Sequence, residues 1–79
     1  MTTNDLLQVT KHWDAGDAGC GQFIVGVKQH LGEMQAGQLL AIRTHNAGAP
    51  VELPAWCRMA GHELVSARHP EYVIRKSQQ

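Results

Sequence analysis

The apolar spacing of this chain changes across a run of turn-forming residues, Asp14-Ala15-Gly16-Asp17-Ala18-Gly19. Before the run, Leu7, Val9 and Trp13 alternate loosely with polar residues, which is typical of a half-buried strand. After Gly21, apolar residues recur at the spacing of one helix face, at Ile24, Val27, Leu31 and Met34. The first half of the chain is therefore predicted to form a strand, a loop and a helix.

The second half alternates between strand and helix patterns. Residues 39–44 are apolar enough for a central strand, and residues 51–60 form a short helix pattern that Gly61 ends. Gly37 stands where a left-handed C-cap of the first helix is favoured. Two further strands and the turn between them are predicted at residues 63–67, 72–75 and 68–71. The predicted fold is a two-layer α/β sandwich, β-α-β-α-β-β, with two helices on one face of a four-stranded mixed sheet.

Length and charge limit what such a chain can do. Its 79 residues predict one domain, residues 1–79, with an ordered core at about residues 6–76. A formal net charge of zero argues against free-standing nucleic-acid binding, which needs clustered Lys and Arg. No apolar run is long enough to span a membrane, and no secretory signal pattern is present. We therefore expect a cytoplasmic protein whose two cysteines remain thiols.

Cys20 is the strongest candidate site residue, because it lies between the glycine-containing loop and the first helix. Unpaired N–H groups and the helix dipole favour a thiolate there, so the pKa of this thiol is expected to be lowered. The flanking Gly19 and Gly21 leave room for a partner. Two interpretations stay open, a nucleophile or a small residue without a chemical role.

Cys57 lies beside Trp56 on the apolar face of the second helix, where a cysteine packs as an inert hydrophobic residue. The chain has five histidines, His12, His30, His45, His62 and His69. Their spacing matches no zinc motif, and no metal or other cofactor is predicted. Two minor hypotheses remain, a composite metal site of Cys20, Cys57 and a strand-end histidine, and a Cys20 dyad with His45 or His62 as base.

Several short segments of the sequence follow one another in a characteristic order and spacing. Asp14 stands six residues before Cys20, and Met34 to Ile42 follows the pattern M-x-x-G-x-x-L-x-I. The later segments are Glu52-Leu53-Pro54-Ala55-Trp56-Cys57, Gly61-His62-Glu63-Leu64 and Tyr72-Val73-Ile74-Arg75-Lys76. In this order and spacing, the chain resembles the TusA/SirA-like family of small sulfur-carrier proteins over about residues 9–76.

Two departures from that family concern the candidate site. The family motif Cys-Pro-x-Pro is replaced by Cys20-Gly21-Gln22-Phe23, which removes two prolines that would stiffen the start of the helix. A family glycine in the preceding loop is replaced by Asp17, whose charge opposes a nearby thiolate. The helix field and Asp17 thus act on Cys20 in opposite senses.

The resemblance implies that Cys20 accepts a sulfane sulfur as a persulfide and relays it, as a sulfurtransferase-like carrier rather than a stand-alone enzyme. The implied partners are a cysteine desulfurase or rhodanese-like donor protein and an acceptor protein, in tRNA thiolation, cofactor sulfuration or sulfur oxidation. Cys57 also matches a family cysteine, and packing remains its expected role. Nothing in the sequence demands a dimer, so a monomer is expected.

Two alternatives have other functions. The absence of both motif prolines supports one alternative, an interaction or regulatory module that has the same fold but does not transfer sulfur. An RNA-binding domain can share the β-α-β-α-β-β order, but zero net charge and the lack of aromatic stacking positions on the strands argue against it.

Overall fold

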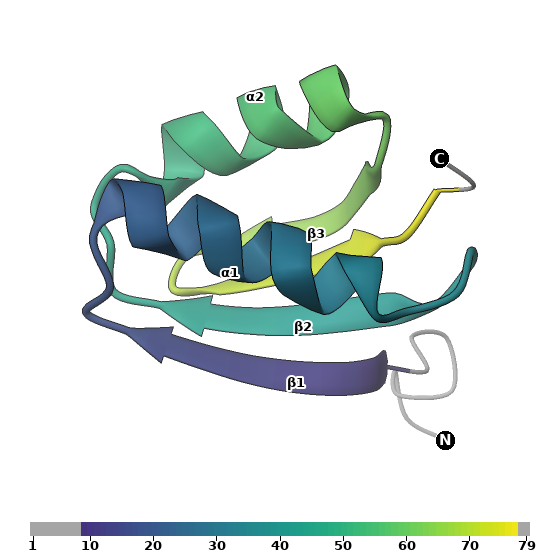
Figure 1. The fold of residues 1–79 in the computed structure, drawn as a ribbon. Helices are drawn as coiled ribbons and strands as arrows, with labels where there is room; N and C mark the ends of the chain where they lie inside the picture. The colour runs from purple at the N-terminus through teal and green to yellow at the C-terminus, as the bar shows by residue number, and fades with distance from the viewer. Residues whose placement is uncertain (1–8, 78–79) are drawn as a thin grey trace.

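The strands and helices follow one another in the predicted order (Figure 1). A computed structural model describes residues 9–77 of the chain. The elements are β1 (Val9–Gly16), α1 (Cys20–Gly32), β2 (Leu39–Thr44), α2 (Ala49–Ala60), β3 (Glu63–Arg68) and β4 (Glu71–Arg75). The predicted strand residue Leu7, the polar start at residues 1–5 and the last two residues lie outside the described part.

The four strands form one mixed sheet in the order β1-β2-β4-β3. β1 and β2 are parallel, whereas β4 is antiparallel to both of its neighbours. Both helices cover the same face of the sheet (Figure 1), which confirms the predicted two-layer α/β sandwich. Because parallel strands end at the same edge, the loops that lead into α1 and α2 lie side by side at the carboxyl ends of β1 and β2.

The core lies between the helices and the sheet. Of the residues predicted on the first helix face, Val27 and Leu31 of α1 are buried, as is Met34 just beyond its end, whereas Ile24 is only partly buried. Phe23 is fully buried and was not predicted, although it stands one helical turn before Val27 on the same face. The other elements contribute Leu40 and Ile42 from β2, Ala49, Leu53 and Cys57 from α2, and Tyr72 and Ile74 from β4.

The predicted loop at residues 14–19 was too long, because β1 continues to Gly16. Asp14 and Gly16 pair with Arg43 and Thr44 of β2, and the extra residue between them forms a bulge. The Asp14 carboxylate accepts a hydrogen bond from the Gly16 N–H at 2.9 Å, and Gly16 has a φ of 58° that favours glycine. Asp14, Ala15 and Gly16 therefore form the end of β1 and are not part of the loop after it.

Two helix boundaries also differ from the prediction. α1 ends at Gly32 with Glu33 as its right-handed cap, so Gly37 is not the C-cap. Gly37 instead has a φ of 89° in the turn before β2, and its N–H donates to the Lys76 carbonyl at 2.8 Å. α2 begins two residues earlier than predicted, at Ala49. Its predicted end at Gly61 is confirmed, and Gly61 forms a left-handed cap there.

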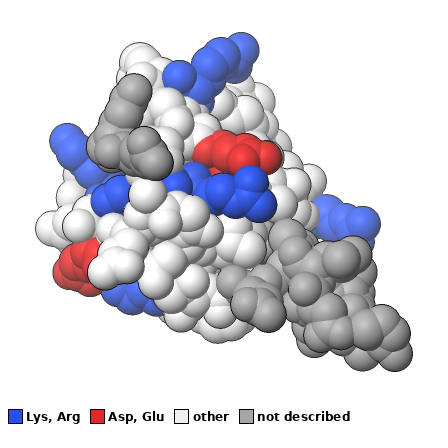
Figure 2. Space-filling model, turned by 90° about the vertical axis from the view of Figure 1, so that its right-hand side faces the viewer, with Lys and Arg blue, Asp and Glu red and all other residues white. Residues whose placement is uncertain are grey.

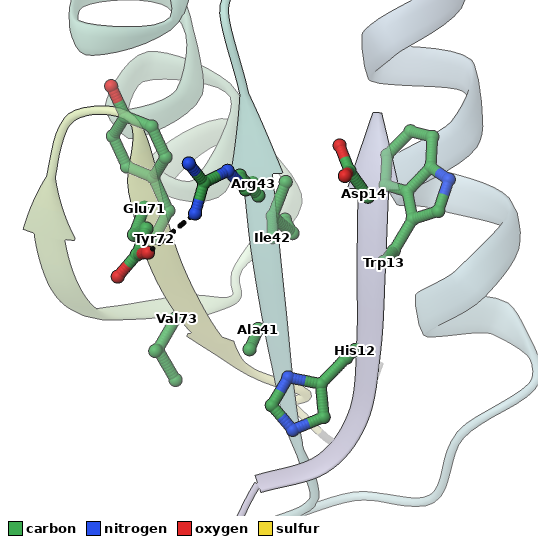
Figure 3. Close-up of a pocket in the computed structure, with 9 residues that line it drawn as sticks. All are labelled: His12, Trp13, Asp14, Ala41, Ile42, Arg43, Glu71, Tyr72 and Val73. Carbon is green, nitrogen blue, oxygen red and sulfur yellow. Dashed lines mark hydrogen bonds and ion pairs between the residues drawn. The ribbon is translucent and has the colours of Figure 1, made fainter. Parts of the chain in front are cut away.

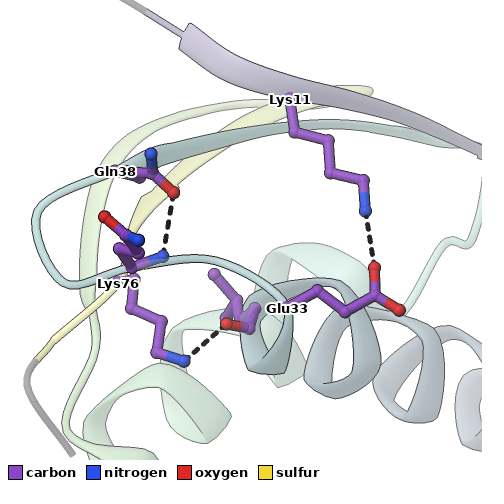
Figure 4. Close-up of polar contacts among 6 residues, drawn as sticks. Lys11, Glu33, Gln38 and Lys76 are labelled. Atoms are coloured by element: carbon purple, nitrogen blue, oxygen red, sulfur yellow. Dashed lines mark hydrogen bonds and ion pairs between the residues drawn. The ribbon is translucent and has the colours of Figure 1, made fainter.

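Basic side chains lie at the end of the molecule where the helices finish. The Lys76 ammonium donates to the Leu31 carbonyl at 2.6 Å, and Lys11 pairs with Glu33 at 2.9 Å (Figure 4). Figure 2 shows this end of the molecule with several Lys and Arg side chains on it. Cations there complement the negative ends of the helix dipoles. Within residues 9–77, neither helix is both long and apolar enough to cross a membrane.

Gly26 lets β1 approach α1 closely. Trp13 packs against the core, with its ring stacked on Phe23 at a centroid distance of 6.0 Å and tilted against the His30 ring at 4.8 Å. A Cβ atom on Gly26 would overlap the Trp13 ring. The absence of a side chain at this position is therefore a packing requirement, although glycine lowers the helix propensity.

We expect Gly26→Ala to lower the free energy of unfolding by about 1 to 3 kcal/mol, because overpacking outweighs the gain in helix propensity. Gly32→Ala is the matched control, since a Cβ there would meet nothing within 4 Å. The control should be neutral or more stable by up to about 1 kcal/mol. Urea unfolding of both variants measures the difference, and equal stabilities would contradict the packing requirement.

Candidate functional site

The loop that precedes Cys20 is fastened to the loop between β2 and α2. The His45 N–H donates to the Gly16 carbonyl at 2.9 Å, and the Asn46 side-chain amide donates to the Ala18 carbonyl at 3.4 Å. Asn46 also accepts the Gly48 N–H at 2.7 Å through its side-chain oxygen. One asparagine thus connects the loops that lead into both helices.

Cys20 is the first residue of α1. Gly19 caps the helix in an extended conformation, and its carbonyl accepts the Phe23 N–H at 2.7 Å. Neither Gly19 nor the first turn of α1 supplies an acidic side chain, so the positive end of the helix dipole is not neutralised from within the helix. The Cys20 side chain itself lies outside the described part of the structure.

Open space flanks this position. Gly19 and Gly21 are exposed, and a Cβ atom on either would meet nothing within 4 Å. This agrees with the expectation that the two glycines leave room beside Cys20. The backbone on either side of Cys20 is therefore uncovered by the rest of the described structure.

The side chains of Asp17 and His45 lie within ion-pair distance of each other beside this helix start. The His45 Nδ1 atom lies 3.5 Å from the Asp17 carboxylate, and the two side chains are 57% and 94% exposed. The pair is ionic only when the imidazole is protonated. Of the two histidines that the sequence suggested as partners of Cys20, His45 is the one that the fold places next to the Cys20 loop.

The turn between β3 and β4 reaches the same edge, which the sequence analysis missed. The Thr44 N–H donates to the Pro70 carbonyl at 2.9 Å, and the His69 Nδ1 atom lies 2.7 Å from the Tyr72 hydroxyl. Tyr72 is buried, and desolvation raises the pKa of its hydroxyl. The antiparallel pairing of β4 with β2 is the signal that could have located His69 here.

His62 lies at the opposite end of the molecule from Cys20. It follows α2, whose 12 residues span about 18 Å. Its ring is tilted against the Trp56 ring at a centroid distance of 5.5 Å, and its Nδ1 atom accepts the Ser77 N–H at 3.0 Å. Burial lowers the pKa of His62 because it disfavours the charged ring, and Lys76 adds repulsion. The predicted dyad of Cys20 with His62 is therefore wrong.

Cys57 is part of the core, as predicted. Its side chain is 2% exposed, and desolvation raises the pKa of the thiol to about 11. Among the side chains that the structure describes, no three His, Cys, Asp or Glu groups lie close enough to hold a metal ion. Burial in α2 separates Cys57 from the exposed loops, so the composite metal site with Cys20 has no support.

A shallow pocket of about 360 Å³ lies on the sheet face that the helices leave open (Figure 3). His12 lines this pocket, together with Asp14 and the Arg43–Glu71 ion pair, whose atoms are 3.2 Å apart. The pocket is formed by β1, β2 and β4 and does not include the start of α1. His12 thus belongs to a different surface from Cys20.

Comparison with known proteins places this arrangement in a family. Residues 12–76 match the family described as sulfurtransferase TusA. The chain belongs to this family. The match includes β1 from its fourth residue, both helices and all the remaining strands. It confirms the resemblance found in the sequence.

TusA-family relatives include two proteins of Bacillus subtilis strain 168 that are named as candidate sulfur carrier proteins. YrkF is 27% identical over 70 residues, which are 89% of this chain and 38% of YrkF. YrkI is 35% identical over 52 residues, which are 66% of this chain and 69% of YrkI. NMA0882 of Neisseria meningitidis, named in the same way, is 35% identical over 55 residues, 70% of this chain and 74% of that protein. This TusA-family chain therefore matches little more than a third of YrkF.

Burial of Cys57 predicts a loss of stability at alkaline pH. Above pH 9 the thiol ionises in the unfolded chain, whereas in the folded chain it stays protonated up to about pH 11. The raised pKa therefore costs roughly 2 to 3 kcal/mol of unfolding free energy between those pH values. Urea unfolding of the wild type and of Cys57→Ala from pH 8 to pH 11 measures this contribution. The variant should lose less stability over that range, and parallel profiles would contradict the assignment.

Proposed function

We propose that this chain is a sulfur carrier that accepts a sulfane sulfur as a persulfide on Cys20 and relays it to a partner protein. Membership of the TusA family, with Cys20 at the start of α1, is the observation that carries the proposal. The names of the relatives support the carrier role. The proposed donor is a cysteine desulfurase or a rhodanese-like protein, and a reducing cytoplasm would keep Cys20 available.

The proposed transfer needs a thiolate and an open approach. The Cys20 thiolate attacks the outer sulfur of the donor's persulfide, which forms a new S–S bond as the donor's S–S bond breaks. The donor cysteine leaves as a thiolate and takes up a proton, so the exchange involves no net oxidation. Delivery to the acceptor is the same exchange, with the acceptor thiolate attacking the outer sulfur on Cys20.

Two features around Cys20 favour this sulfur transfer. The uncompensated positive end of α1 stabilises a thiolate or a persulfide anion at its first residue. The exposed glycines on either side leave space for a second sulfur atom and for a partner's cysteine. A carrier of this kind needs no further catalytic group, because the donor and the acceptor supply the other thiols.

Hydrogen bonds between loops can replace the stiffness that the missing prolines would provide. The Asn46 amide holds the Ala18 carbonyl, and the His45 N–H holds the Gly16 carbonyl, on the segment just before Cys20. Gly21 leaves an N–H at the position of the family's first proline. The altered motif is therefore compatible with a fixed position for Cys20.

Intact-mass spectrometry after incubation with a cysteine desulfurase and cysteine tests the proposal. The wild type and Cys57→Ala should each gain the mass of one sulfur atom, and reductant should remove it. Cys20→Ser should gain none, because the only other cysteine is buried. A rhodanese with thiosulfate serves as the second donor.

Sulfur that persists in Cys20→Ser and is lost in Cys57→Ala would show that the thiol assignment is wrong. The absence of an adduct on every folded variant with both donors would overturn the carrier proposal. That result would favour the interaction module, and circular dichroism of each variant establishes that it is folded.

A further inference from the structure

The charged pair beside Cys20 has a consequence for its reactivity, one that rests on the proposed function. Asp17 lies three residues before Cys20, and its carboxylate lies 3.5 Å from the His45 ring. A negative charge near a thiol disfavours the thiolate, whereas an imidazolium favours it. We propose that His45 is a charge-compensating residue for Cys20, whose ring, when protonated, offsets the charge of Asp17 and keeps the thiol reactive.

The backbone holds the pair in place. The His45 N–H is bonded to the Gly16 carbonyl, next to Asp17, and the following residue, Asn46, is bonded to Ala18. An exposed ion pair is ordinarily weak, because two mobile side chains must be ordered to form it. Here the two backbones are already fastened together, which keeps the charges close to each other and to the start of α1.

Several other charged or titratable groups at this edge have contacts of their own. Arg43 and Glu71 pair with each other at 3.2 Å on the open sheet face. His69 lies against the Tyr72 hydroxyl, and Glu52 lies in the first turn of α2, near Gly48. Asp14, whose carboxylate accepts the Gly16 N–H, and Arg68 at the end of β3 also lie at this edge. Asp17 and His45 lie on the two loops that are bonded together just before Cys20, so we expect their charges to act on it most directly.

The proposal predicts a dependence on pH with a defined sign. Compensation requires a protonated imidazole, and protonation of an imidazole increases as the pH falls. At pH 6, His45→Gln leaves Asp17 unopposed, whereas Asp17→Asn leaves the imidazolium unopposed. The two substitutions should therefore change Cys20 reactivity in opposite directions, and the double variant should return to the wild-type value.

The test measures the rate at which iodoacetamide, a neutral reagent, alkylates Cys20 from pH 5.5 to pH 8.5, with the modified residue located by peptide mass spectrometry. At pH 6 we expect His45→Gln to react about two- to threefold more slowly and Asp17→Asn about two- to threefold faster. The double variant should react like the wild type. The difference between His45→Gln and the wild type should shrink toward pH 8.5, because compensation requires a protonated ring.

Three results would overturn the inference: an unchanged rate for His45→Gln at pH 6, a loss that does not shrink toward pH 8.5, or a double variant that reacts like His45→Gln. A structural role for His45 would give the second or the third result. No sulfur donor is used, so the test is independent of the proposed function. Failure of sulfur loading alongside the expected alkylation pattern would overturn the carrier role alone.

Discussion

The parallel pairing of β1 with β2 is the constraint on which the rest of the structure depends. It runs from Val9 opposite Leu39 to Gly16 opposite Thr44 and requires α1 to cross over one face of the sheet. The same direction brings the carboxyl ends of both strands to one edge. Consequently the helix that begins at Cys20, the Asp17 loop and the loop of His45 and Asn46 meet at one place.

The close packing of β1 against α1 depends on one glycine and one aromatic side chain. Gly26 allows Trp13 to lie against α1, and Trp13 stacks on Phe23, which anchors the first turn of the helix in the core. The position of Cys20 is thus tied to buried contacts three residues further along the helix. A reactive group at the end of an exposed loop can be positioned accurately enough for a reaction when a rigid element fixes that end of the loop.

The apolar periodicity was sufficient to predict the element order, but on the buried face of α1 it missed Phe23 and included the partly buried Ile24. The residue types were misleading at Asp14 to Gly16, because aspartate and glycine are typical of loops. Here these residues pair with β2, and the extra residue between them forms a bulge. The contact between Asp17 and His45 could not be predicted, since it depends on the paths of two loops that lie far apart in the sequence. Strand order alone could have excluded His62, because α2 carries the chain to the opposite end before that residue.

The separation of the two cysteines also determines how cargo could leave a carrier of this design. A second thiol within reach of a persulfide would attack its inner sulfur, close an internal disulfide and release hydrosulfide into solution. Cys57 is buried in α2 and stays protonated, so it cannot act as a resolving thiol. If Cys20 carries a persulfide as proposed, its outer sulfur would therefore be protected from loss to the second cysteine and would leave by attack from another molecule.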